Sequence, residues 1–292
     1  MKKDGYSKIV TGCGIGCAVI VGIVILSVVG IYTYIDHTMG DVDEIEKQTE
    51  QLEAAHGKPE EFIPVFDNEL FTSRIKSFLT LRDSLISGSS TFIEAIRTLE
   101  LKKNNLDESE SFWSVLGILG SGFEVIPHVV DYYNQRNDLL LKNEMSLGEY
   151  YFFYITSYYS FMKYSPSDGP AFDIMSENGN GIHLEEVDED NDGPETIIKR
   201  RNIEIRTKAN RMYSIFLSNY ISHSNGSETD KFTVMMDEEL QKLKADKLRI
   251  PWEDSLPVMI TSLLEPHQLK MEVTYSKLLN SLDFKSDPDK RE

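Results

Sequence analysis

The sequence predicts an all-α fold: an N-terminal transmembrane helix followed by one multi-helix globular domain that contains a long acidic loop. The first observation is a run without a charged residue at positions 9–35. The second is the recurrence of apolar residues at three- and four-residue spacing along most of the remaining chain, as in helices with one buried face. The third is that no segment alternates apolar and polar residues as a half-buried strand does.

The composition describes an ordinary folding chain with a strong negative charge. Hydrophobic residues make up 40% of it and charged residues 27%, which excludes collagen-like and wholly disordered proteins. The 48 acidic residues exceed the 30 lysines and arginines, so the formal net charge is −18. A surface this negative repels phosphate backbones, and we therefore expect no nucleic-acid partner.

Residues 9–35 are predicted to anchor the chain in a lipid bilayer. The run exceeds the roughly 20 apolar residues that span a bilayer and the roughly 7–15 of a signal-peptide core. Lysines precede it and acidic residues follow it, which by the positive-inside bias makes 1–8 a cytoplasmic tail and places 36–292 outside the cytoplasm. The lysines are Lys2, Lys3 and Lys8, and the acidic residues are Asp36, Asp41, Asp43, Glu44 and Glu46.

Both cysteines, Cys13 and Cys17, lie within the predicted anchor. The exported domain therefore has no disulfide and must be stabilised by a packed core. Gly12 and Gly16 stand one helical turn apart, a spacing that lets two membrane helices approach closely. Small residues are common in membrane spans in general, so self-association and a monomeric anchor are both open.

A stalk helix is expected over residues 36–57. Val42, Ile45, Thr49 and Leu52 follow a 3-4-3 spacing, which suits either a short coiled-coil seam or a helix lying on its own domain. So short a seam cannot hold a coiled coil by itself, and we favour the second arrangement.

The helical domain is expected over 58–282, with the acidic loop at 165–193 and a charged tail at 283–292. Asp67 or Asn68 can cap its first helix, and Ser146 with Glu149 forms the capping-box pattern before an aromatic helix. Pro194 suits a first helical position. The predicted helices cover about 68–86, 91–101, 124–142, 147–164, 194–222, 230–247, 257–264 and 267–282, and a buried glycine-rich segment is expected at 111–123.

The aromatic helix carries rings on almost every side of its axis between Tyr150 and Tyr164. A helix that is apolar all round is buried, whereas a stacking surface for sugars or peptides would present its rings on one face. We therefore predict that this helix forms the centre of the core.

The acidic loop contains the candidate metal site. Asp188, Asp190 and Asp192 alternate along the chain, as in the first half of an EF-hand, where alternate carboxylates converge on one calcium ion. The twelfth position of the loop holds a lysine where an EF-hand requires a glutamate, which excludes an EF-hand. Two alternatives remain: an irregular calcium site that also uses Glu195, and a solvated acidic loop without a cofactor.

A basic cluster follows the acidic loop. It suits an anionic partner, such as a phospholipid headgroup or a cell-wall polymer, or it neutralises the acidic run at 185–192; we favour neutralisation. Its members are Lys199, Arg200, Arg201, Arg206, Lys208 and Arg211.

Catalytic motifs give little support to an enzyme. Ser73-x-x-Lys76 and Ser160-x-x-Lys163 match a serine–lysine pattern, but chance produces as many matches, and the companion Ser-Asp-Asn and Lys-Thr-Gly motifs are absent. The sequence has no G-x-S-x-G, P-loop or dinucleotide fingerprint. None of the 6 histidines has the H-x-x-x-H spacing of a helical zinc site.

Three segments resemble a group of bacterial single-span, all-helical envelope proteins to which no function is assigned. They are Phe78–Asp83, Met145–Tyr150 and Leu264–Leu282, and the similarity extends over most of the chain. The resemblance implies an anchor in the inner membrane and a bacterial source; with the topology predicted from the flanking charges, the domain is then expected in the periplasm. It supplies no catalytic residue and no ligand.

The sequence therefore favours a membrane-anchored, non-enzymatic interaction or scaffold module that binds an envelope protein or itself. A tethered hydrolase with a dispersed site and a calcium-responsive binding module are the alternatives. A cleft that holds two ionisable groups with opposed pKa shifts would favour the hydrolase. A tightly filled domain with an exposed apolar patch of roughly several hundred Å² would favour the interaction module.

Overall fold

The computed structural model describes residues 45–104, 128–170, 194–224 and 231–285. The chain divides into two units, 1–44 and 45–292, and these ranges all belong to the second. Within them the structure is helical and contains no strand, which confirms the all-α class. No helix in these ranges is both long and apolar enough to cross a membrane. The predicted anchor at 9–35 and the segment 111–123 lie outside the described residues.

The described ranges contain a succession of helices. Residues 45–56 and 128–142 are helical. The remaining elements are η1 (Pro59–Glu61), α2 (Asn68–Gly88), α3 (Ser90–Asn104), α5 (Leu147–Tyr154), η2 (Ile155–Phe161), α6 (Pro194–His223), α7 (Lys231–Ala245), α8 (Val258–Leu264), η3 (Glu265–His267), α9 (Gln268–Val273) and α10 (Asn280–Lys285).

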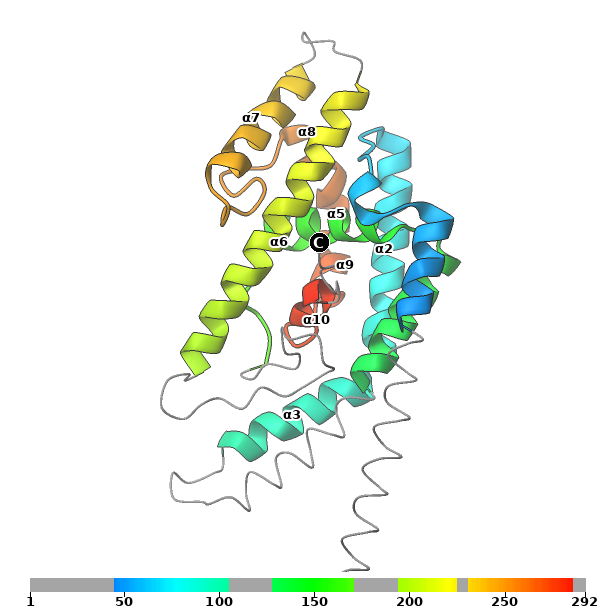
Figure 1. Cartoon of the computed structure of the whole chain (residues 1–292), viewed down its shortest axis with the longest axis vertical. Helices are drawn as coiled ribbons and strands as arrows, with labels where there is room; N and C mark the ends of the chain where they lie inside the picture. The colour runs from blue at the N-terminus through cyan, green and yellow to red at the C-terminus, as the bar shows by residue number, and fades with distance from the viewer. Residues whose placement is uncertain (1–44, 105–127, 171–193, 225–230, 286–292) are drawn as a thin grey trace, which may run out of the picture. The chain divides into compact units, whose positions relative to one another are not determined.

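The aromatic segment formed by α5 and η2 is the centre of the core. In Figure 1, α5 lies between α2 and α6, and it contacts both. Every side chain from Tyr150 to Tyr159 is buried, so the predicted burial of this helix is confirmed. The Phe152 ring stacks on Tyr213 of α6 at 5.6 Å between centroids, and the Phe153 ring meets Phe71 of α2 edge-on at 5.2 Å. The rings on its different sides thus hold the neighbouring helices together.

A second apolar cluster joins α3, the helix at 128–142 and α10. It contains Phe92 and Ile96 of α3, Tyr132 of the middle helix, and Leu282 of α10, all at most 2% exposed. The C-terminal helix is therefore part of the folded domain.

Local sequence signals correctly place the starts of two helices. The Asp67 carboxylate accepts the backbone N–H groups of Glu69 and Leu70 at the start of α2. The Ser146 hydroxyl accepts the N–H of Glu149 at the start of α5. The second half of the predicted capping box is wrong, because the Glu149 carboxylate pairs with Arg74 of α2 at 2.5 Å instead of returning to its own helix.

The helix at 45–56 packs on the domain. Leu52 is 2% exposed within the main core cluster, and Ile45 packs against the second cluster. Asn137 also donates a hydrogen bond to the Thr49 hydroxyl at 3.4 Å. These contacts occupy the residues of the possible coiled-coil seam and favour the arrangement in which the helix lies on its own domain.

The aromatic helix is not α-helical throughout. It begins at Leu147, changes to a π-helix at Ile155 and ends at Phe161. The Ser160 hydroxyl donates to the carbonyl of Ile155, five residues earlier, and the Met162 N–H donates to the carbonyl of Ser157. The wider turn admits an extra residue, a feature that periodicity in the sequence does not reveal.

The predicted helix at 267–282 is also wrong. It breaks at Thr274, after α9, and helix resumes only at Asn280. The carbonyl of Thr274 accepts the Tyr158 hydroxyl at 2.9 Å and the Arg82 Nε at 3.4 Å. These long-range hydrogen bonds use a carbonyl that would otherwise accept from the next turn of the helix.

The boundary between the domain and the charged tail needs a correction as well. It was predicted after residue 282, but Asp283 is 0% exposed and lies inside the domain. Its burial depends on the counter-charge of Arg82 in α2.

Candidate functional site

The strongest polar constellation in the described chain surrounds Arg82 and Asp283, two fully buried residues of α2 and α10. Arg82 Nη1 donates to both carboxylate oxygens of Asp283 at 3.0 Å. The hydroxyls of Tyr132 and Tyr150 donate to Asp283 Oδ1 at 2.5 Å each. Four helical segments therefore meet at one buried ion pair.

Two aromatic rings and the backbone carbonyl of Thr274 also surround Arg82. The guanidinium lies 5.1 Å from the centroid of the Tyr154 ring and 5.7 Å from that of Tyr158, distances at which a cation is attracted by a ring face. The Tyr158 hydroxyl in turn donates to the carbonyl of Thr274. The residue at which the helix breaks after α9 is therefore part of the same network.

Asn280 extends this network toward the start of the acidic loop. Its Oδ1 accepts the hydroxyls of Tyr154 at 3.0 Å and Tyr159 at 2.8 Å. Its Nδ2 donates to the carbonyls of Pro166 and Asp168. The side chain of one residue thereby fixes α10 to η2 and to residues 166–168.

The electrostatics of the network favour a charged Arg82 and neutral tyrosines. Burial is the largest single influence on Arg82 and opposes its charge, but the Asp283 carboxylate and the neighbouring tyrosines together hold the pKa of Arg82 well above its ordinary value. Burial, joined by the negative charge of Asp283, raises the pKa of Tyr132 and Tyr150 well above the usual range. None of these groups reaches solvent, so a substrate cannot meet them. We assign the network a structural role.

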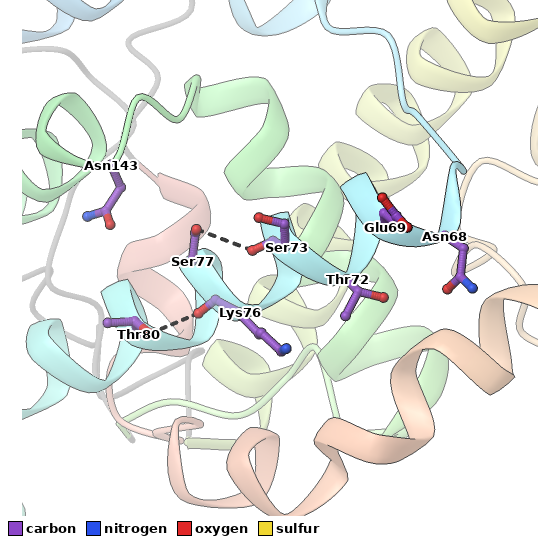
Figure 2. Close-up of a pocket in the computed structure, with 8 residues that line it drawn as sticks. All are labelled: Asn68, Glu69, Thr72, Ser73, Lys76, Ser77, Thr80 and Asn143. Atoms are coloured by element: carbon purple, nitrogen blue, oxygen red, sulfur yellow. Dashed lines mark hydrogen bonds between the residues drawn. The ribbon is translucent and has the colours of Figure 1, made fainter.

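The first serine–lysine pair lies on an open face of α2 and forms no catalytic dyad. Figure 2 shows the Lys76 side chain extending away from the Ser73 hydroxyl. The Ser77 hydroxyl donates to the carbonyl of Ser73, and the Thr80 hydroxyl donates to that of Lys76. The face borders a depression of about 680 Å³ lined by Asn68, Glu69, Thr72, Ser73, Lys76, Ser77, Thr80 and Asn143.

The second serine–lysine pair is used in structural contacts. The buried Ser160 hydroxyl donates to the carbonyl of Pro251 at 2.7 Å. The Lys163 ammonium donates to the carbonyls of Trp252 and Glu253 at 3.0 and 3.1 Å, and burial lowers the pKa of Lys163. The two side chains connect η2 to the 251–253 turn, and the ammonium is not directed at the hydroxyl.

The described residues include only one of the four candidate calcium ligands. Asp188, Asp190 and Asp192 lie outside the described residues, and Glu195 is exposed in the first turn of α6. Among the residues that are described, no group of three or more histidine, cysteine or acidic side chains is placed to hold a metal ion. The calcium site therefore stays a prediction.

The basic cluster separates into different environments along α6. Arg201 is 3% exposed and donates to the carbonyls of Ser167 and Pro170. Arg206 donates to the carbonyl of Leu248 and pairs with Glu253 at 3.2 Å. Arg201 thus binds a segment that precedes α6 in the sequence, and Arg206 binds a segment that follows it.

An apolar groove opens where the extended segment 62–67 meets α6, α7 and α8. It has a volume of about 550 Å³. Phe66, Tyr220 and Phe232 form its aromatic base: the Phe66 ring meets the other two edge-on at 5.2 and 4.9 Å between centroids. Val65 and Met259 at the groove are 47% and 40% exposed. The lining residues are Ile63, Pro64, Val65, Phe66, Asp67, Tyr220, His223, Ser224, Phe232 and Met259.

The groove wall formed by segment 62–67 is held firmly. Asn219 of α6 donates to the carbonyls of Glu60 and Phe62 at 2.7 and 3.1 Å. Gly148 of α5 allows Phe62, the first residue of this segment, to pass closely, because a Cβ at Gly148 would lie 2.7 Å from the Cβ of Phe62. This wall of the groove is therefore held against α5 and α6.

Sequence reasoning missed this groove. Its residues come from four separate segments. The only local signal is the apolar run Ile63–Phe66, which contains a proline and precedes the helix capped by Asp67. An apolar run in a connecting segment is equally consistent with core packing, and Phe62 of the same segment does pack against Phe152 and Phe216.

Comparisons of the chain with protein-family models, with curated proteins and with solved structures found no match.

Proposed function

We propose that the chain is a membrane-anchored envelope protein whose helical domain is a non-enzymatic interaction or scaffold module. The observation that carries the proposal is a contrast within the domain. Its buried ionisable groups at Arg82 and Asp283 are sealed in the core, whereas an apolar groove is open at its surface. Exposed apolar surface marks interaction sites and binding grooves, whereas acid–base catalysis requires accessible ionisable groups.

The location belongs to the same proposal. The charge-free run at 9–35, with lysines before it and acidic residues after it, supports an inner-membrane anchor with the domain in the periplasm. Protease added to spheroplasts should digest the domain at 36–292 and leave the N-terminal tail intact. A domain that resists protease until the membrane is dissolved would contradict this topology.

Site-specific crosslinking of the full chain in cells tests the interaction function. A photo-crosslinking residue at Val65, in the groove, should yield one defined crosslinked protein, and the crosslink should form again with that protein in purified form. The matched control is Leu269 of α9, which is 79% exposed and does not line the groove. Equal crosslinking from both positions, or none from Val65, would contradict a docking role for the groove.

The hydrolase alternative is weaker because the hydroxyl and the ammonium of the Ser160–Lys163 pair each bind backbone carbonyls. The calcium-responsive alternative rests on the alternating carboxylates at Asp188, Asp190 and Asp192. It is compatible with an interaction module, because a cation that orders the start of α6 would regulate the domain without taking part in catalysis.

A further inference from the structure

We propose that the groove binds an amphipathic segment of a partner protein, with apolar side chains entering the groove and a basic side chain facing Asp67. This inference rests on the proposed interaction function and specifies the chemistry of the partner. Its first basis is the apolar, preformed base of Phe66, Tyr220 and Phe232. Grooves of this kind accept the apolar face of a helix or extended segment.

The second basis is the charge around the groove. Asp67 lines it, and the exposed residues Glu60, Glu61 and Glu69 adjoin segment 62–67 in the sequence. Lys58 and Lys231 also adjoin the lining segments, but the described lining itself includes no lysine or arginine. A basic partner is therefore complementary to this rim.

Asp67 retains an oxygen for such a partner. Its Oδ1 accepts both N–H groups that cap α2, at 3.1 and 3.0 Å. Within the part of the chain that the structure describes, no group donates to Oδ2. A lysine or arginine can therefore pair with Asp67 while the helix cap stays intact.

The same charges disfavour two other possible occupants of the groove, a second copy of this chain and an anionic membrane. Two copies of a chain with a net charge of −18 repel each other, so self-association through an acidic rim is unfavourable. An anionic bilayer surface is repelled for the same reason, since basic residues are what attract such membranes. A cationic, apolar segment of another protein is the occupant that both the groove and its rim favour.

The test follows the methyl resonance of Met259 by NMR in the full chain, reconstituted in nanodiscs of zwitterionic phosphatidylcholine. The probe is a synthetic amphipathic helix of leucine and lysine, and it should shift the Met259 signal saturably. A leucine–glutamate peptide of the same pattern and a glycine–lysine peptide of the same charge should leave the signal unchanged. Val65→Asp should abolish the shift, and Leu269→Asp, outside the groove, should preserve it.

Charge recognition is tested by Asp67→Asn, because asparagine also caps helices well. It should weaken binding of the leucine–lysine peptide roughly two- to five-fold, as for an exposed ion pair. Asp237→Asn, which removes an exposed acid of α7 outside the lining, should have no effect.

Several results would overturn the inference. If the leucine–glutamate peptide bound equally well, or Asp67→Asn had no effect, the partner would not be basic, while groove crosslinks from Val65 would still support the interaction function. If no peptide shifted Met259, the stated partner chemistry would be wrong, and the crosslinking result would decide separately on the function. A shift on raising the chain concentration alone, or on adding phosphatidylglycerol vesicles, would identify a second copy or a membrane as the occupant.

Discussion

Replacing Asp283 with asparagine is expected to destabilise the domain by about 3–5 kcal/mol, the usual cost of leaving a buried charge without its partner. Both Arg82 and Asp283 are 0% exposed, and Arg82 Nη1 lies 3.0 Å from Asp283 Oδ1. Asparagine keeps the shape of the side chain and an oxygen that can accept the hydroxyls of Tyr132 and Tyr150. The change therefore removes the charge with little effect on packing.

The same region supplies a matched control. Asp83, the residue after Arg82, pairs with Lys270 of α9 at 2.7 Å, but these side chains are 53% and 43% exposed. Exposed pairs contribute about 0–1 kcal/mol, so Asp83→Asn should cost no more than that. The double change of Arg82→Met with Asp283→Leu should cost less than Asp283→Asn, because no unpaired charge remains buried.

Urea unfolding of the full chain in a mild detergent, followed by circular dichroism, measures these free energies by linear extrapolation. The buried pair should stand clearly apart from the exposed one. If the cost of Asp283→Asn fell within about 1 kcal/mol, the upper value for an exposed pair, the role assigned to Asp283 would be refuted. A double variant less stable than Asp283→Asn would refute the explanation by desolvation.

Three further predictions concern other parts of the chain. Phe152→Ala should lower the free energy of unfolding by about 3–5 kcal/mol, as for a buried phenylalanine; an unchanged melting temperature would contradict a core role. Burial, aided by the positive charge of Lys76, lowers the pKa of His267, so its contribution to stability should be present above about pH 6.5 and be lost as the pH falls through the folded pKa. An NMR titration checks the lowered value, and Lys76→Gln should raise it; a pKa at or above the ordinary value would count against this. Millimolar calcium should raise the melting temperature if the acidic loop binds it, and replacing Asp188 and Asp190 by asparagine should abolish that effect; no heat on titration and no thermal shift would leave a solvated loop.

The helices of this domain were predictable wherever their signals are local. Asp67 before α2 and Ser146 before α5 cap the first turns through contacts within three residues. The burial of the aromatic helix followed from its own composition, because rings on all sides leave no face for solvent.

Features that depend on distant partners were not predictable. The helix break at Thr274 follows from hydrogen bonds to Arg82 and Tyr158. The burial of Asp283 requires the same arginine, far away in the sequence. A carboxylate near a run of charged residues reads as solvated unless its counter-charge is known.

The candidate docking site is of the same kind. Its base joins Phe66, Tyr220 and Phe232 from three separate elements, and no single stretch of sequence contains the groove. The calcium motif, by contrast, is contiguous and was easy to notice, and it stays a prediction. A contiguous motif is easy to find in a sequence, whereas a groove formed by distant segments is not.

The link between Arg82 and Asp283 also has a consequence for the order in which the domain is made. A ribosome releases α2 long before α10, and a domain generally folds as a unit once its segments have emerged. Until α10 arrives, the cation of Arg82 has no counter-charge in the aromatic interior, so that interior cannot close over it at low cost. Completion of the core thus coincides with completion of the domain's last described helix. A chain truncated before Asp283 should therefore leave its aromatic segments exposed and be digested more readily by proteases.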